Sequence, residues 1–222
     1  MSPCQKHPGR GGFTLIELLA VIAVIGILAG ILIPTVSAVR TSANKARTKV
    51  QFAQWAAAIE SFRGEYGYYP VFHDSALVNP PGQSTEPAAL HVFHDLLAGR
   101  RRNLDPLPAF VATAPLAPEA QNRKRIAFYG FSESDFTAAN SPSPHLIRDA
   151  FDNTEIAVLV DRNLDGVIRI GAGGDYPALP AVQGLTPGAT EFPATGVRAG
   201  VVFYAPAPGA GPDRPDFILS WK

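Results

Sequence analysis

Near its N-terminus the chain reads Gly11-Gly12-Phe13-Thr14-Leu15-Ile16-Glu17, and an apolar run follows through residues 18–36. Between positions 13 and 39 the only charged side chain is Glu17. Because a helix rises about 1.5 Å per residue, a run of this length crosses a hydrocarbon core of about 30 Å. We therefore expect residues 13–36 to form a membrane-spanning helix.

The lone carboxylate of this run needs a partner. Glu17 lies in an otherwise apolar helix, where an ionised side chain is costly in lipid. If the chain is cut after Gly12, the new amine of Phe13 supplies a cation. In a bundle of identical helices, the Phe13 amine of one copy can pair with Glu17 of its neighbour. We expect this ion pair to serve assembly of the chain with itself.

The same residues resemble the cleavage signal of type IV prepilins and type II secretion pseudopilins. Gly12 stands before the cut, Phe13 after it, and Glu17 is fifth in the mature chain. Pro34 falls where many of these proteins carry a proline. The resemblance implies that prepilin peptidase removes residues 1–12 and methylates the Phe13 amine. It also implies a single-pass protein of the bacterial inner membrane with a periplasmic C-terminal domain.

Basic residues after the apolar run favour the opposite orientation. Arg40, Lys45, Arg47 and Lys49 follow it closely, and the positive-inside rule places such a flank in the cytoplasm. We follow the resemblance, which implies a cytoplasmic leader.

Composition limits the remaining possibilities. The 222 residues have a formal net charge of zero, which gives no indication of nucleic acid as an obligate partner. The 21 prolines and 20 glycines predict a soluble part rich in loops. The sole cysteine, Cys4, precedes the cut, so the mature chain holds no thiol for a disulfide. In this it agrees with the major pseudopilins.

The helix is expected to continue to about residue 64, with residues 37–64 in the soluble part and Pro34 kinking or loosening it. A stripe of larger side chains, Phe52, Trp55, Ile59 and Phe62, marks the part that packs on a sheet. Gly64 and Gly67 are the expected stops. The following Gly67, Tyr69 and Pro70 resemble the end of this helix in the general secretion pathway protein G family.

Residues 65–222 are expected to form one globular periplasmic domain. A helix over residues 87–97 is predicted, capped by Thr85 and closed by Gly99. Short β-like runs follow at residues 126–131, 155–160, 167–170, 200–205 and 217–221. A long helix followed by a small antiparallel sheet predicts an α+β, pilin-like fold.

Two loops are candidate calcium sites. Asp161, Asn163 and Asp165 place oxygen ligands at alternate positions before Gly166, as in the first half of a calcium loop, with Asp175 as a further candidate ligand. The twelfth position is alanine rather than glutamate, and an Asx-type hairpin turn is the alternative interpretation.

The second loop is suggested by a resemblance. The last residues, 216–221, resemble the ending of protein G-like pseudopilins, which bind calcium just before their final strand. The resemblance therefore implies Asp213 and Asp216 as ligands, although Phe217 replaces an acidic residue. Residues 149–153 resemble another family segment, which we interpret as a structural turn.

No catalytic constellation is evident, so we expect no enzyme. His91 and His94 have metal-ligand spacing, but an ordinary amphipathic helix is the favoured interpretation. The resemblance implies a structural subunit of a type II secretion pseudopilus or type IV pilus-like filament. Its partners would be further copies, other pseudopilins and the inner-membrane assembly platform. The alternative is a minor pilin or membrane-anchored binding module for a secreted substrate, polysaccharide or DNA, using loops 71–84, 103–122 and 171–199.

Overall fold

The computed structural model describes residues 14–110, 114 and 116–222. The chain divides into two compact units, residues 1–43 and 44–222. Helix α1, Leu15–Tyr66, contributes to both units, and the backbone at Pro34 is helical. Helix α1 continues through Gly64 and ends before Gly67, whose N–H donates to the Arg63 carbonyl at 2.8 Å. The predicted long helix is therefore confirmed for the described residues.

The second unit adds short helices and one sheet. The elements are α2 (Val92–Ala98), α3 (Pro118–Gln121), the 3-10 helix η1 (Glu133–Asp135), β1 (Ala157–Val160), β2 (Val201–Pro206) and β3 (Phe217–Leu219). The strands form an antiparallel sheet in the order β1-β2-β3. Tyr204 on the central strand is paired with Ala157 on one side and Leu219 on the other. This arrangement confirms the predicted α+β fold.

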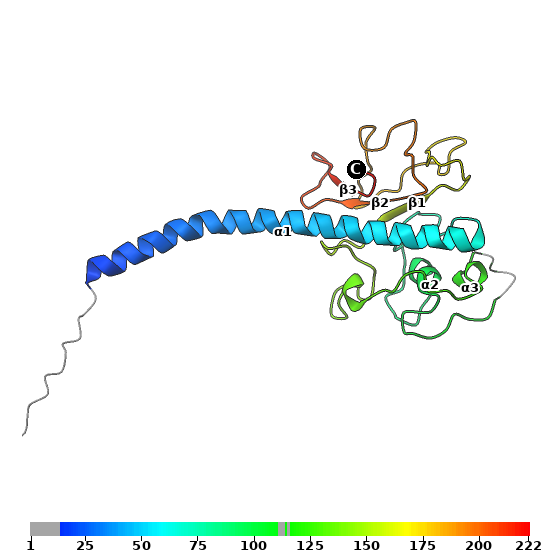
Figure 1. Ribbon diagram of the computed structural model, residues 1–222, viewed down its shortest axis with the longest axis horizontal. Helices are drawn as coiled ribbons and strands as arrows, with labels where there is room; N and C mark the ends of the chain where they lie inside the picture. Colours follow the sequence, from blue (N-terminus) through cyan, green and yellow to red (C-terminus); the bar gives the residue numbers. More distant parts are fainter. Residues whose placement is uncertain (1–13, 111–113, 115) are drawn as a thin grey trace, which may run out of the picture. The chain divides into compact units, whose positions relative to one another are not determined.

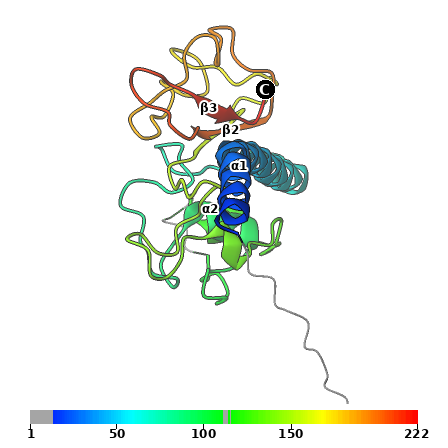
Figure 2. The same cartoon turned by 90° about the vertical axis from the view of Figure 1, so that its left-hand side faces the viewer.

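Within this unit, α1 lies between the sheet and a layer that contains α2 and α3 (Figures 1 and 2). The predicted stripe of large side chains makes both contacts and is fully buried. Phe52 stacks on Phe203 of β2 with ring centroids 5.4 Å apart, and Trp55 meets Phe93 of α2 edge-on at 5.3 Å. The later part of α1 is therefore the centre of the hydrophobic core.

The sheet is buried on both faces. Along β2, Val201, Phe203 and Ala205 face the α1 core, whereas Val202 and Tyr204 belong to a second apolar cluster. That cluster is completed by residues from the long loop region after β1, including Ile168, Tyr176, Val182, Phe192 and Val197. The alternation has the period of two that a strand imposes. The proline- and glycine-rich loops thus form a structural layer over the sheet.

The helix predicted over residues 87–97 begins later than expected. Its N-cap is His91 rather than Thr85, because the His91 ring accepts a hydrogen bond from the His94 backbone N–H at 3.3 Å. Asp95 returns the contact by accepting the His91 backbone N–H at 3.0 Å. The predicted stop at Gly99 is confirmed, with φ at +67°.

Two predicted strands are wrong. Residues 126–131 form no strand, because the backbone N–H groups of Phe128 and Tyr129 both donate to the Leu97 carbonyl at the end of α2. Residues 167–170 make only isolated bridges, which join Ile168 to Val197 and Ile170 to Tyr176. Alternating apolar residues in these segments pack on the core without a neighbouring strand to pair with.

Candidate functional site

The start of α1 holds the lone carboxylate of the apolar segment. Glu17 Oε2 accepts hydrogen bonds from the Thr14 backbone N–H at 2.8 Å and from the Thr14 hydroxyl at 2.7 Å. The Glu17 N–H returns a bond to Thr14 Oγ1 at 3.3 Å. This reciprocal arrangement is a capping box, which satisfies backbone donors at a helix start. The Thr-x-x-Glu spacing is the sequence signal from which this cap could have been predicted. Gly12 and Phe13 lie outside the described residues.

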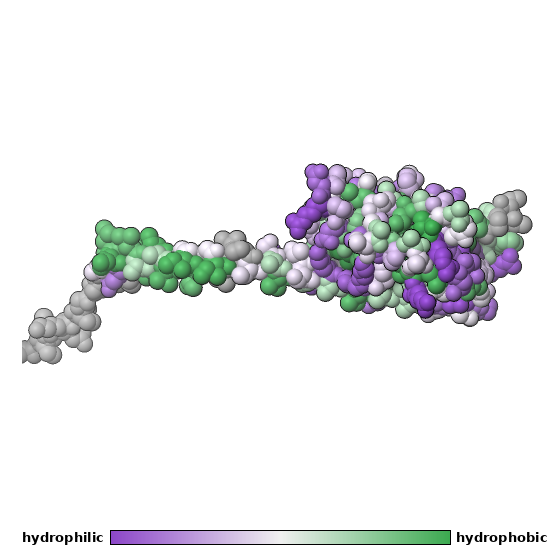
Figure 3. Space-filling model, turned by 90° about the horizontal axis from the view of Figure 1, so that it is seen from above, coloured by the Kyte–Doolittle hydropathy of each residue, from purple (hydrophilic) through white to green (hydrophobic). Residues whose placement is uncertain are grey.

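The rest of this segment presents apolar side chains all round the helix. Leu15 is 78% exposed, Ile22 56% and Ile31 62%. Figure 3 shows the first part of α1 as a largely apolar surface, in contrast to the mixed surface of the second unit. By length and composition, α1 is able to cross a membrane. A helix that is apolar on every side requires either lipid or other apolar helices around it.

Comparison with known families agrees with these features. Residues 8–33 match the family model of the prokaryotic N-terminal methylation motif. The motif marks a pilin-like protein. It indicates processing by prepilin peptidase and assembly into a filament, and proteins that carry it are structural rather than enzymatic. No curated protein and no solved structure matches the chain.

The motif also indicates that the apolar helix anchors the protein in a membrane. In type IV pilins such a helix anchors the protein in the membrane, and this pilin-like chain has the same combination of motif and apolar helix. The motif does not distinguish a pseudopilin from a pilin. It ends at residue 33, so the functional features of residues 44–222 have to be taken from the structure.

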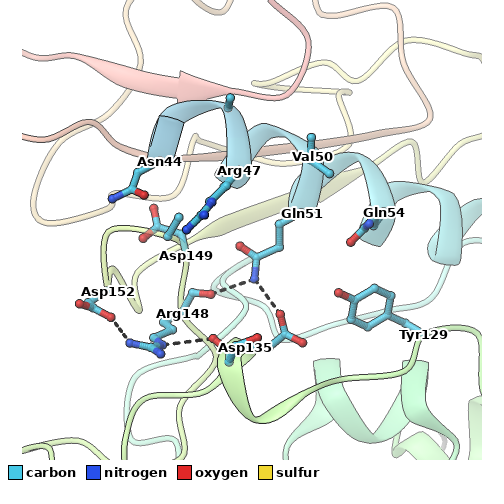
Figure 4. Close-up of a pocket in the computed structure, with 13 residues that line it drawn as sticks. Asn44, Arg47, Val50, Gln51, Gln54, Tyr129, Asp135, Arg148, Asp149 and Asp152 are labelled. Carbon is cyan, nitrogen blue, oxygen red and sulfur yellow. Dashed lines mark hydrogen bonds and ion pairs between the residues drawn. The ribbon is translucent and has the colours of Figure 1, made fainter. Parts of the chain in front are cut away.

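The second unit contains a cavity of about 700 Å³ beside α1 (Figure 4). One wall is the face of α1 that carries Asn44, Arg47, Gln51 and Gln54, and the opposite wall includes residues 148–152. Cavities of this size are typical of small-molecule sites. Sequence reasoning missed this cavity because its two walls are about a hundred positions apart in the chain.

The predicted calcium loop at residues 161–166 is described in full. Asp161 accepts backbone N–H groups from Asp165 at 3.2 Å and Gly166 at 2.7 Å, one on each carboxylate oxygen. Asn163 Oδ1 accepts the Asp165 N–H at 3.0 Å, which is the hydrogen bond of an Asx turn. The Asp165 carboxylate also pairs with Arg169. These contacts are those of the alternative interpretation, and calcium binding at this loop stays a prediction.

The other predicted ligands are placed separately. Asp175 accepts the backbone N–H of Arg162 at 2.8 Å and that of Arg169 at 2.9 Å, so it fastens the loop that precedes it. Asp216 forms an ion pair with Lys45 at 3.3 Å, and Asp213 is exposed. Among residues 14–110, 114 and 116–222, no group of three or more His, Cys, Asp or Glu side chains is arranged to hold a metal ion.

The His91–His94 pair is a buried structural element of the pilin-like chain. His91 Nε2 lies 3.0 Å from Asn79 Oδ1, while His94 Nδ1 lies 2.9 Å from Asp95 Oδ1. Arg101 donates to the other Asp95 oxygen at 2.6 Å. Burial lowers the pKa of both histidines. The two histidines therefore face different partners and do not converge on a shared ligand.

The segment at residues 149–153 forms the turn that we expected. Both oxygens of Asp149 are used, because Oδ1 accepts the N–H groups of Phe151 and Asn153 and Oδ2 accepts the Asn153 amide. Burial raises the pKa of this carboxyl. The turn therefore fixes the wall of the cavity that faces α1.

Proposed function

We propose that the mature chain is a structural subunit of a type II secretion pseudopilus or a closely related type IV pilus-like filament. Cleavage between Gly12 and Phe13 and methylation of Phe13 would precede assembly. The observation that carries this proposal is the methylation motif at residues 8–33, which overlaps the start of a helix with Glu17 as its only charge up to residue 39.

Before assembly, the apolar part of α1 would hold the subunit in the inner membrane as a single span, with residues 44–222 in the periplasm. The assembly platform would then extract the chain and stack it on further copies and on other pseudopilins. The exposed large side chains between Leu15 and Ile31 support this proposal, because packing them against identical helices keeps them out of water in the filament.

Glu17 would set the register of this packing. In the single chain its Oε2 is engaged by Thr14, while no described group is bonded to Oε1. A carboxylate offers about four lone-pair sites, so the capped Glu17 can still accept the Phe13 amine of a neighbouring copy. The ion pair would form only when the Phe13 amine of one subunit lies at the depth of the Glu17 carboxylate of its neighbour, which is about 6 Å further along the helix at about 1.5 Å per residue.

The proposal is tested by mass spectrometry of the mature N-terminus together with filament incorporation. The expected terminus is N-methylated Phe13. Glu17→Ala is expected to be cleaved normally and to abolish incorporation into filaments sheared from cells, because the neighbouring amine loses its partner in lipid. A chain that begins at Met1 would refute the processing step, and normal incorporation of Glu17→Ala would refute the pairing role.

Thr14→Val is the matched control, because it removes the hydroxyl that bonds Glu17 but keeps the carboxylate. Loss of a helix cap costs about 1 kcal/mol, and we expect Thr14→Val to reach the filament. If both variants fail equally, the carboxylate acts as a cap within one chain rather than as a contact between chains.

A further inference from the structure

The cavity beside α1 has one wall built on a single helix face. Asn44, Arg47, Gln51 and Gln54 follow one another at intervals of three and four residues, so they lie on the same side of α1. At about 1.5 Å per residue the row is about 15 Å long. Val50 adds an exposed apolar side chain to the lining. This wall is a row of planar polar groups with Ala46 and Val50 as its apolar contacts.

The groups that hold the cavity together are already paired. Gln51 donates to Asp135 Oδ1 at 3.3 Å and to the Arg148 carbonyl at 3.0 Å, which ties α1 to the opposite wall (Figure 4). The Arg148 guanidinium forms an ion pair with Asp152. The Asp149 carboxylate accepts backbone N–H groups within its own turn. Most of the charged side chains in the lining are therefore already engaged in hydrogen bonds or an ion pair within the protein.

Three groups on the helix wall are not paired. Within the described part of the chain, the side chains of Asn44, Arg47 and Gln54 make no hydrogen bond or ion pair. The two amides can each donate and accept, and the guanidinium has five donors. The hydroxyl end of Tyr129 also points into the cavity (Figure 4). The free groups thus combine donors and acceptors, with Arg47 as the one uncompensated charge among these described side chains.

This combination suits a ligand rich in hydroxyl groups. Each hydroxyl is both donor and acceptor, which matches amide side chains better than a phosphate chain would, since a phosphate chain needs a cluster of cations. The cavity shares Arg148 and Asp152 with a second one of about 430 Å³, whose lining includes the hydroxyl residues Thr137, Ser143 and Thr154. We propose that this cavity binds a short saccharide, with Asn44, Arg47 and Gln54 contacting its hydroxyl or carboxylate groups.

The test uses the processed full-length chain in micelles of lauryldimethylamine oxide, because glycoside detergents would compete for the site. Maltotriose, the trimer of N-acetylglucosamine and trigalacturonate are titrated by calorimetry, and contacts are checked by saturation-transfer NMR. We expect saturable binding of at least one trisaccharide. Arg47→Ala and Gln54→Ala are each expected to weaken it about tenfold or more, which corresponds to about 1.4 kcal/mol.

Matched controls lie elsewhere on the same unit. Arg198 and Asn140 are exposed and outside the cavity, so Arg198→Ala and Asn140→Ala should bind as the wild type does. Absence of binding for all three trisaccharides overturns the proposal, as does unchanged affinity in Arg47→Ala and Gln54→Ala. If no saccharide binds and these two variants also fail to enter filaments, the cavity is a contact between copies of the chain.

The outcome is separable from filament function. Glu17→Ala lies in the other compact unit and is expected to bind the saccharide normally even though it does not assemble. Loss of assembly with retained saccharide binding would leave both proposals standing, and normal assembly with retained saccharide binding would reject only the filament role of Glu17.

Discussion

Ile22 and Ile59 are the same residue type on the same helix, yet Ile22 is 56% exposed and Ile59 is fully buried. Around Ile22 the helix is apolar on every side, whereas around Ile59 it is apolar on one face and polar on the other. The first pattern fits a surrounding of lipid or identical helices, and the second fits a sheet with water behind it. Helix α1 is therefore continuous in its backbone, but its two parts have side chains suited to two different environments.

The largest expected difference comes from truncating these two residues in parallel. Ile59→Ala leaves a cavity in the core, and such changes cost about 2–5 kcal/mol of unfolding free energy. Ile22→Ala removes a side chain outside that core, so the stability of residues 44–222 should change by less than about 0.5 kcal/mol. Urea unfolding of the micelle-bound chain, followed by tryptophan fluorescence, measures both. Equal losses in the two variants would contradict the division of α1 into two environments.

A smaller effect is expected where the second half of α1 approaches β2. The Tyr69 hydroxyl donates to Glu60 Oε1 at 2.7 Å, and burial with this contact raises the pKa of Tyr69 to about 12. A Cβ built on Gly200 would lie 1.9 Å from that hydroxyl oxygen. Gly200→Ala should therefore overpack the site and cost about 1–3 kcal/mol in the same urea experiment.

Gly64 provides the matched control for this substitution. It lies in α1, and a Cβ added at this position would meet no atom within 4 Å apart from its chain neighbours and the helix's own backbone. Alanine in a helix is favoured over glycine by about 0.5–1 kcal/mol, so Gly64→Ala should raise stability slightly. A tolerated Gly200→Ala would show that Tyr69 and Glu60 can move away from β2.

The histidines make the second unit sensitive to acid. Burial is the main cause that lowers the pKa of His91 well below its usual 6.5, helped by the nearby Arg102 and His94. The unfolded chain therefore binds more protons as the pH falls below 6.5, and the stability contributed by neutral His91 is lost there. We expect a loss of up to about 1.4 kcal/mol per pH unit between pH 6.5 and 5.5.

Thermal melts at pH 6.5 and 5.5, repeated with single variants, show which histidine causes the loss of stability. His91→Gln should lower stability at neutral pH but flatten the pH dependence. His73 is exposed, and His73→Gln is the matched control for the loss of one histidine side chain. A slope that survives in His91→Gln would place the titration on another group, with His94 as the next candidate because burial also lowers its pKa.

Sequence patterns predicted the features that depend on local periodicity. The stripe from Phe52 to Phe62, the stop at Gly99 and three of the strands follow from spacing within one segment. The wrongly predicted strands are explained by contacts with residues far away in the sequence. Residues 126–131 have a strand-like pattern, but the Leu97 carbonyl takes the N–H groups of Phe128 and Tyr129, and no local pattern indicates that contact.

The candidate sites divide in the same way. The motif around Glu17 was evident because all its residues are adjacent in the sequence, and the family comparison supports it. The cavity beside α1 was not predictable, since Gln51 meets Asp135 and Arg148 only after the chain has folded around the helix. Contacts between segments far apart in the sequence determine what the second unit can bind.

The smallest expected effect concerns calcium, which would bind only in the second unit. Open loops of this kind bind calcium with Kd values in the range of about 10⁻⁴ to 10⁻³ M, so a concentration about three times Kd would add about 0.8 kcal/mol. We expect the melting midpoint to rise by about 2–3 °C with calcium and to return with a chelator. Asp165→Asn should abolish the rise if the loop after β1 is the site, and Asp213→Asn if the C-terminal loop is. Because Asp161 and Asp175 already accept backbone N–H groups, a midpoint that calcium leaves unmoved would mean that these carboxylates only fold the loop.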